Sequence, residues 1–284
     1  MSVQFPRTQV ENISLSRMII GSNWMAGFSH TSPAADRMIV RRHSQPDSIV
    51  AMLETFLEYG VDTMMAPFLS HPVIVRAVRE AQEKTGKKII MIDTPIINVD
   101  DNPAARKEAE QVIRQGRELG AEICLIHHSS AEQLVSKNRQ TIDRLDDYTA
   151  MIRDAGMVPG LSAHMPELVV YSDQNGYDVQ TYIQIYNCMG FLMQVEVETV
   201  NQIIHNAKKP VMTIKPMAAG RCTPFVGLNF SFATIRDCDM VTVGCFNADE
   251  AAEDIEISLA ALEHRRAQIG KRSSPNNNQS AFGK

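Results

Sequence analysis

The sequence lacks paired cysteines, long apolar runs and any excess of positive charge. Its five cysteines stand singly with no CxxC pair, which argues against zinc ribbons, iron–sulfur clusters and a disulfide framework. The net charge of −5 leaves no basic field for nucleic acid or anionic lipid. No stretch has the length of a membrane span or of a signal-peptide core. We therefore expect a cytoplasmic protein with a small-molecule substrate, which binds neither nucleic acid nor membrane.

Short β-rich runs alternate with longer segments of helical periodicity through most of the chain. The helices are predicted to begin near a proline and end at a glycine, as Pro72 and Gly86 illustrate. Eight such units predict a single-domain α/β fold, the (β/α)8 TIM barrel, over residues 1–265, with a flexible polar tail over 266–284. An open doubly wound sheet is less favoured, because no GxGxxG follows an early strand. The predicted strands are 17–22, 62–66, 88–93, 122–127, 158–162, 182–186, 211–215 and 240–244.

Polar residues gather at the ends of these strands, where barrel enzymes carry their active sites. His127 follows three apolar strand residues and is a candidate general acid, or a group that polarises a carbonyl. The adjacent His128 is expected to face away from the lumen, because side chains alternate along a strand. Lys215 is either the ion-pair partner of an aspartate or a Schiff-base nucleophile. The predicted catalytic set is Asp62, Asp93, His127 and Lys215.

Two further segments have open interpretations. The longest connection, 24–45, is either a lid that carries cations over the rim or a solvated surface loop. A cluster of apolar residues after the sixth strand is either a pocket wall or a subunit contact of a homo-oligomer. The residues in question are His30, Arg37, Arg41, Arg42 and His43 in the first segment, and Met189, Phe191, Leu192 and Met193 in the second.

The strand ends resemble those of the aldo/keto reductase superfamily over residues 17–265. The matching pieces are GVDTM, ICLIH, GLSAHMPE, YIQIYN, IKPMAAGR and VTVGCFNADEAAED, in the same order and spacing. The resemblance implies a catalytic aspartate, tyrosine, lysine and histidine, with Asp62 and His127 as the aspartate and the histidine. The chain departs from that pattern at the other two, since 64–68 holds no tyrosine and Asp93 stands where the lysine should be. It resembles a divergent member that lacks the catalytic tyrosine and lysine.

The resemblance also implies a nicotinamide dinucleotide, NAD or NADP. The acidic stretch Asp249–Asp254 contains no lysine or arginine, so NAD is favoured over NADP, which carries an extra 2′-phosphate. By the resemblance the cofactor-binding residues would be Ser162, Asn187, Gly220, Arg221, Gly244 and Asn247.

Three hypotheses of function remain from the sequence. The first is a divergent enzyme of aldo/keto reductase type that acts on a small carbonyl or sugar-like substrate. The second is a metal-dependent lyase, isomerase or hydrolase that binds a divalent metal through Asp62, Asp93, His127 and His164, although no HxH or HExxH spacing supports it. The third is a non-catalytic binding barrel. The charged strand ends favour an enzyme over a non-catalytic barrel. Unpaired buried charges reduce stability and are seldom kept without a function.

Overall fold

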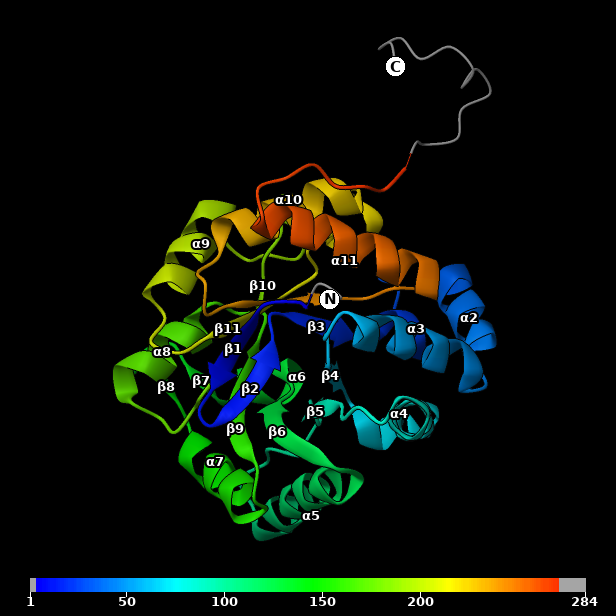
Figure 1. The fold of residues 1–284 in the computed structure, drawn as a ribbon. Coiled ribbons are helices and arrows are strands. Elements are labelled where there is room, and N and C mark those ends of the chain that lie inside the picture. Colours follow the sequence, from blue (N-terminus) through cyan, green and yellow to red (C-terminus); the bar gives the residue numbers. More distant parts are fainter. Residues whose placement is uncertain (1–3, 271–284) are drawn as a thin grey trace.

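A computed structural model of the chain describes residues 4–270, and eight parallel strands close there into a barrel (Figure 1). The strands follow one another in chain order around the barrel, and the last pairs with the first through Val241 and Met18. The predicted (β/α)8 fold is confirmed, and each predicted strand overlaps an observed one. The barrel strands are β3 (Met18–Gly21), β4 (Thr63–Ala66), β5 (Ile90–Asp93), β6 (Ala121–Ile126), β9 (Val158–Ala163), β10 (Tyr182–Ile185), β11 (Val211–Ile214) and β12 (Met240–Val243).

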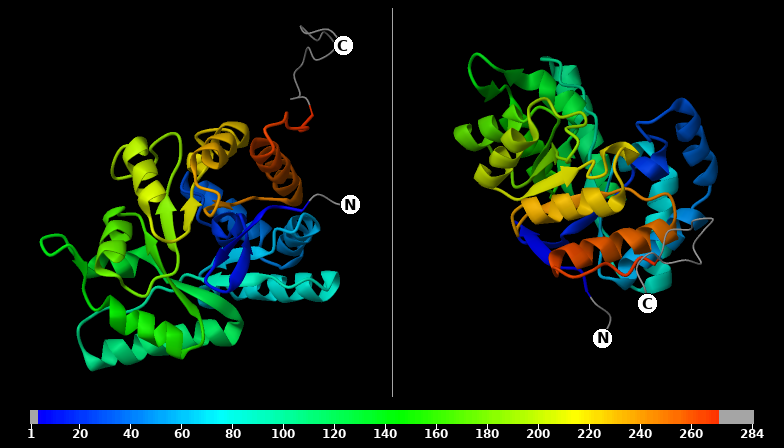
Figure 2. Two further views of the ribbon diagram at one scale, coloured as in Figure 1. Left: turned by 60° about the vertical axis from the view of Figure 1, so that its left-hand side comes forward. Right: turned by 90° about the horizontal axis from the view of Figure 1, so that it is seen from above.

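A long helix lies between each pair of consecutive barrel strands, and another follows the last strand; Figure 2 shows them around the outside of the barrel. Local chemistry sets their ends: Asn102 and Thr223 cap helices with their side-chain oxygens, and Gly120 ends one in the left-handed region at φ +113°. These helices are α3 (Asp47–Glu58), α4 (Pro72–Thr85), α5 (Pro103–Leu119), α7 (Leu145–Asp154), α8 (Glu167–Asn175), α9 (Val197–Asn206), α10 (Pro224–Thr234) and α11 (Ala248–Leu262).

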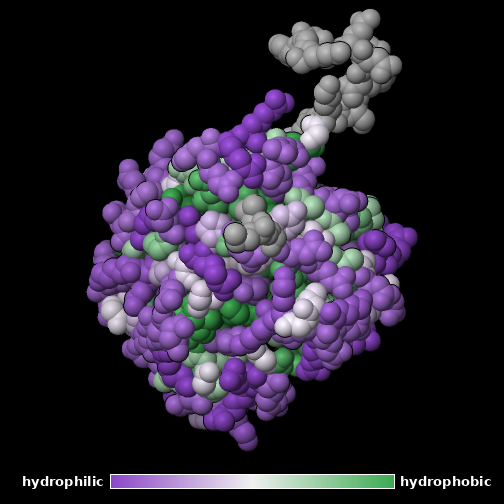
Figure 3. Space-filling view, in the orientation of Figure 1, coloured by the Kyte–Doolittle hydropathy of each residue, from purple (hydrophilic) through white to green (hydrophobic). Residues whose placement is uncertain are grey.

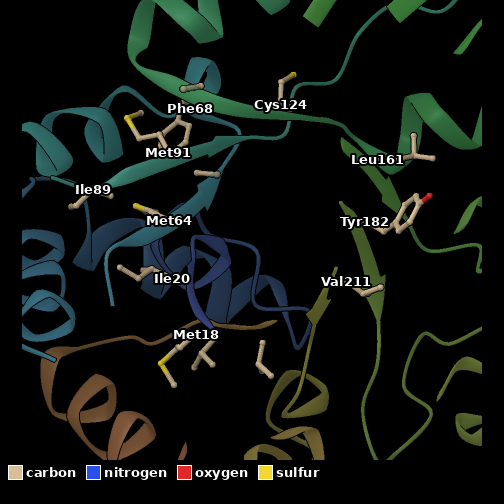
Figure 4. Packing of buried hydrophobic residues seen from close by; sticks show 14 of the residues in the cluster. Met18, Ile20, Met64, Phe68, Ile89, Met91, Cys124, Leu161, Tyr182 and Val211 are labelled. Atoms are coloured by element: carbon tan, nitrogen blue, oxygen red, sulfur yellow. The ribbon is translucent and has the colours of Figure 1, made fainter. Parts of the chain in front are cut away.

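Side chains of the barrel strands alternate between two apolar layers. In β5, Ile90 and Ile92 pack in the barrel interior, while Met91 between them packs outward under the helices. Figure 4 shows members of the outer layer, among them Met64 and Val211. This alternation decides which strand residues can reach the centre of the barrel. The interior layer includes Ile19, Met65, Ile92, Leu125, Ile183, Met212 and Met240.

A β-hairpin that the sequence analysis did not predict closes the amino end of the barrel. Its strands are β1 (Arg7–Val10) and β2 (Ile13–Ser16), which lie in front of the barrel in Figure 1. Val10 and Leu15 join the interior apolar layer. The hairpin was missed because its strands have four residues each and its turn carries no glycine.

The connection 24–45 is largely helical, which corrects the interpretation of a solvated surface loop. It contains α1 (Asn23–Ala26) and α2 (Pro33–Arg42), and Ser32 caps α2 by accepting a hydrogen bond from Ala35 N. Ile39 alone is buried in α2, so its apolar face was too narrow to identify from sequence. The remaining short elements are α6 (His128–Ala131), the strand pair β7 (Val135–Ser136) and β8 (Thr141–Ile142), and single helical turns at Phe68–Ser70, Glu132–Leu134 and Ala218–Gly220.

The visible surface of the barrel is mainly hydrophilic (Figure 3). Figure 3 shows hydrophilic residues over most of the face that carries the hairpin, with smaller apolar areas between them. Within residues 4–270, no helix combines the length and the apolar character needed to cross a bilayer. The predicted tail begins as an irregular segment in which Gln268 N donates to Glu256, and residues 271–284 lie outside the described part.

Leu15 tests whether the hairpin stabilises the barrel by filling its amino end. Because this side chain is fully buried in the interior layer, we expect Leu15→Ala to lower the free energy of unfolding by about 2 to 5 kcal/mol. Chemical denaturation measures this change. Leu192→Ala is the matched control, because Leu192 is 48% exposed, and a loss no larger than that of the control would show that the hairpin is dispensable.

Candidate active site

A cavity of about 1000 Å³ opens at the carboxyl ends of the barrel strands. Every barrel strand, or the residue directly after it, contributes to its wall. The wall is mainly apolar, with a few polar groups, which is the usual character of a small-molecule site. Contributions by strand are Gly21 from β3, Met65 from β4, Thr94 after β5, His127 after β6, Ser162 from β9, Ile183 from β10, Lys215 after β11 and Thr242 from β12.

Lys215 lies in this cavity without an acidic partner. It follows β11 directly, and its backbone takes the left-handed conformation at φ +62°. Within residues 4–270 it takes part in no ion pair, and its Nζ lies 3.4 Å from Nε2 of His30. Burial lowers the pKa of Lys215 to about 8. The structure therefore contradicts the ion-pair interpretation of this residue.

His127 is held in one tautomer at the wall of the cavity. Its Nδ1 accepts a hydrogen bond from Ser129 N at 3.3 Å and lies 2.7 Å from Ser129 Oγ. A neutral imidazole that accepts at Nδ1 carries its hydrogen on Nε2. Burial, reinforced by His128, lowers the pKa of His127 to about 4, so the ring is neutral at physiological pH. It can therefore donate one hydrogen bond to an oxygen in the cavity.

His128 and His164 stack at the same wall, with ring centroids 3.6 Å apart. Burial and the neighbouring His128 lower the pKa of His164 to about 3. The expectation that His128 faces away was wrong, because β6 ends at Ile126 and the strand alternation does not extend to residue 128. Glu132 holds this part of the cavity wall in place by accepting hydrogen bonds from the backbone N–H groups of His164 and Met165.

Asp62 lies at the opposite end of the barrel from this cavity. It precedes the first residue of β4, and its Oδ2 forms an ion pair with Arg7 of the hairpin at 2.9 Å. A residue that opens a strand belongs to the amino end, whereas the cavity position near the carboxyl end of β4 is taken by Met65. The prediction that Asp62 joins the other site residues is therefore wrong.

Asp93 ends β5 but points away from the cavity. It follows the outward register of Met91, and a Cβ on Gly116 of α5 would collide with its Oδ2. Its Oδ1 accepts from Phe68 N at 3.1 Å, while Oδ2 is buried without a hydrogen-bond partner. Burial raises the pKa of Asp93 to about 6. Asp93 thus packs between the barrel and α5, and the predicted contact with the substrate is wrong.

The four residues of the predicted metal site do not come together. Asp62 and Asp93 point elsewhere, which leaves only His127 and His164 in the cavity. In the described part of the chain no group of three or more His, Cys, Asp or Glu side chains is arranged to hold a metal ion. The metal-dependent hypothesis thus loses its ligand set.

The residues that the resemblance assigned to a dinucleotide divide into two groups. Ser162, Gly220, Arg221 and Gly244 line the cavity. Arg221 also stacks over the ring of Phe191, 3.8 Å from its centroid. Two others do not line it: Asn187 holds the backbone of Phe191 through both side-chain atoms, and Asn247 caps α11 by accepting from Glu250 N.

The cavity becomes acidic where it reaches α11. Glu250, Glu253 and Asp254 all line this end. Glu250 also accepts a hydrogen bond from Phe246 N, so two backbone donors near the start of α11, Phe246 N and Glu250 N, already have partners within the chain. Burial raises the pKa of Asp254 to about 7. This end is unfavourable to a dianionic phosphate group.

Several solved structures have the same fold as this chain. A candidate aldo-keto reductase from Pseudomonas aeruginosa matches with a TM-score of 0.66 at 12% identity, over 92% of this chain and 98% of the other. The chain has the fold of an aldo-keto reductase. A glycerol dehydrogenase from Gluconobacter oxydans matches with a TM-score of 0.59 at 12% identity, over 95% and 98%. An aldose reductase from Giardia lamblia matches with a TM-score of 0.52 at 11% identity, over 94% and 90%.

At 11 to 12% identity, these matches show a shared fold and not a shared activity. No protein-family model matches the chain, and no curated protein matches it in sequence. No tyrosine lines the cavity within residues 4–270. The chemistry of the site therefore has to be argued from the residues that are present.

Two cavity residues were not identified from sequence. His71 lies on the connection after β4, and Asp254 lies on the inner face of α11. His71 had a local signal, because it stands directly before a helix that begins at Pro72. Asp254 reaches the cavity through the packing of a distant segment. His30 is the one residue named for the possible lid that lines the cavity.

Asp93 provides a test of the structure around β5. The folded-state pKa of Asp93, about 6, lies above the ordinary value of 3.8, so the folded protein holds the proton more tightly. Stability is then lost as the pH rises from about 4 to 6, by on the order of 2 to 3 kcal/mol. We expect Asp93→Asn to remove this loss, so that the variant matches the wild type at pH 4 and exceeds it above pH 6.

Denaturant titrations of both proteins across this pH range measure the difference. Asp101→Asn is the matched control, because its carboxylate is exposed. Parallel stability curves for wild type and Asp93→Asn would contradict the buried, outward position of this carboxyl group.

Proposed function

We propose that this barrel is an enzyme that acts on a small carbonyl or sugar-like compound bound in the cavity. One observation carries the proposal: Lys215 is half-buried in the cavity at the carboxyl end of β11 with no counterion among residues 4–270. An unpaired, partly desolvated amine costs stability, and such groups are concentrated at functional sites. This cost also weighs against a non-catalytic binding barrel.

The groups around Lys215 suit a carbonyl oxygen. Lys215 offers an ammonium or an amine, and His127 offers its Nε2–H, which forms no other hydrogen bond in the described part of the chain. Donors held in a largely apolar cavity stabilise the negative charge that develops on a reacting carbonyl oxygen. The proposal therefore places the carbonyl group between Lys215 and His127. The fold shared with reductases and dehydrogenases of alcohols and aldehydes supports the same substrate chemistry.

The cavity fits NAD(H) better than NADP(H). Ser162, Gly220, Arg221 and Gly244 line it and would hold a dinucleotide, which supplies or accepts a hydride when bound. The carboxylates of Glu250 and Glu253 oppose an added 2′-phosphate at the α11 end. We propose NAD(H) as the dinucleotide that this cavity admits.

A panel of short aldehydes, ketones and aldoses tests the carbonyl proposal. Each compound is incubated with the protein alone, with NADH or with NADPH, and its consumption is followed by NMR. We expect at least one to be consumed, and Lys215→Met to reduce the rate roughly a hundredfold, because the group that meets the carbonyl is lost.

Lys107→Met serves as the control, since Lys107 is exposed on α5. A panel that is inert under all three conditions, or a Lys215→Met variant as active as the control, would overturn the proposal.

Dinucleotide preference is tested by fluorescence titration of the protein with NADH and with NADPH. Like-charge repulsion of about 1.4 kcal/mol at the α11 end should make NADPH bind roughly tenfold more weakly. Glu253→Gln should reduce this difference, because its carboxylate lines that end without capping the helix. Tighter binding of NADPH would contradict the assignment, and binding of neither would remove the dinucleotide from the proposal.

A further inference from the structure

The backbone that carries Lys215 is held in an unusual conformation. Lys215, Ala218 and Ala219 all have positive φ, at +62°, +50° and +54°. Residues other than glycine rarely adopt this region, and each such residue is strained. Three such residues stand within five positions of the connection after β11. We take this strain as a sign that the connection holds the side chain of Lys215 in a required position in the cavity.

We propose that Lys215 is a nucleophile that joins the carbonyl carbon of an aldehyde or ketone as an imine, with His30 as the base that receives its proton. The inference rests on the proposed function, because it requires a carbonyl compound in the same cavity. It goes further by assigning covalent chemistry, which a lysine that only polarises the carbonyl would not perform. The class of substrate is an aldehyde or ketone small enough to reach Nζ.

The environment of Nζ favours the neutral amine that imine formation needs. No carboxylate of the described residues pairs with it, and burial lowers its pKa to about 8. At pH 7 roughly a tenth of the Lys215 amine is then neutral, against roughly one in three thousand for a lysine of ordinary pKa. The concentration of the reactive form is thus about three-hundredfold higher.

His30 presents an unprotonated nitrogen to this amine. Its Nδ1 lies 2.9 Å from the carbonyl oxygen of Phe28, which can only accept, so Nδ1 carries the hydrogen. Nε2 is then the free acceptor, and it lies 3.4 Å from Nζ of Lys215. Burial and the nearby Lys215 lower the pKa of His30, which keeps the ring neutral. His30 can therefore accept a hydrogen bond from Lys215, and a proton once bond formation to the carbonyl carbon has made that nitrogen more acidic.

The proposed step balances without an oxidant or reductant. The lone pair of neutral Nζ forms a bond to the carbonyl carbon, and the carbonyl π electrons move to oxygen, which accepts a hydrogen bond from Nε2–H of His127. The nitrogen, now positively charged, loses one proton to His30, and this proton is passed to the oxygen to give a hydroxyl group. As the C–O bond breaks, the nitrogen lone pair forms the C=N bond, and the departing hydroxide takes the second Nζ proton through His30. One amine and one carbonyl thus give one imine and one water. The protonated imine withdraws electrons from the adjacent carbon, which favours proton removal there.

The inference is tested with acetylacetone, a β-diketone that converts a neutral lysine amine into a stable conjugated enaminone. The wild-type protein is titrated with acetylacetone, the near-ultraviolet absorption of the adduct is followed, and the modified residue is located by peptide mass spectrometry. We expect one adduct per chain at Lys215, with a rate that rises through a midpoint near pH 8.

Three variants separate nucleophilic from electrostatic action. Lys215→Arg keeps the positive charge but has no amine that can form an imine, and Lys215→Met removes both properties. We expect neither to form the adduct, whereas Lys107→Met should react like the wild type. His30→Gln should slow adduct formation roughly tenfold or more and leave it at Lys215. Circular dichroism shows that each variant is folded.

The outcomes distinguish this inference from the proposed function. An adduct that is absent from Lys215, or that forms equally at exposed lysines, would overturn the inference. Consumption of a carbonyl compound by Lys215→Arg at the wild-type rate would also overturn it, and would leave the carbonyl function in place. An adduct at Lys215 beside an inert carbonyl panel would instead count against the proposed function.

Discussion

The proposed chemistry of this barrel depends on an amine in the cavity that is paired with no carboxylate of the described residues. Lys215 is placed there by the end of β11 and by a left-handed backbone conformation that commits its side chain to the cavity. Its burial costs free energy, and that cost is met by the apolar packing of the closed barrel. The neighbouring histidines remain neutral for the same reason, since burial and the lysine both disfavour their protonated forms. The site therefore combines two basic residues, Lys215 and Arg221, with several neutral imidazoles.

Barrel geometry also determines which polar residues are excluded from the site. Arg7 of the hairpin forms an ion pair with Asp62, so this carboxylate helps to hold the hairpin against the amino end of the barrel. Asp93 faces α5 because its register in β5 is outward. With both aspartates elsewhere, the centre of the cavity is basic and its α11 end is acidic. A polar substrate would thus meet opposite electrostatic environments at its two ends.

Much of the fold, and less of the site, could be predicted from the sequence. The eight strands were found because buried parallel strands are short apolar runs and because Pro and Gly mark the helix ends. The direction in which each side chain points was harder to predict. Asp62 lies at the start of its strand and not at its end, and His128 begins a helix after its strand has ended. The contact between His30 and Lys215 joins residues 185 positions apart, so only the closed barrel reveals it. His127 and Lys215 were predicted correctly to reach the cavity, because each directly follows the last residue of its strand.

The proposed chemistry depends above all on the charge state of Lys215. Its pKa can be measured by NMR of protein labelled with carbon-13 at the lysine Cε, with Lys215→Met to assign the resonance. We expect a single lysine that titrates near pH 8, apart from the remaining lysines. Titration of Lys215 together with the exposed lysines, near the ordinary value of 10.5, would show that the amine is solvated or paired and would overturn the proposed role of Lys215.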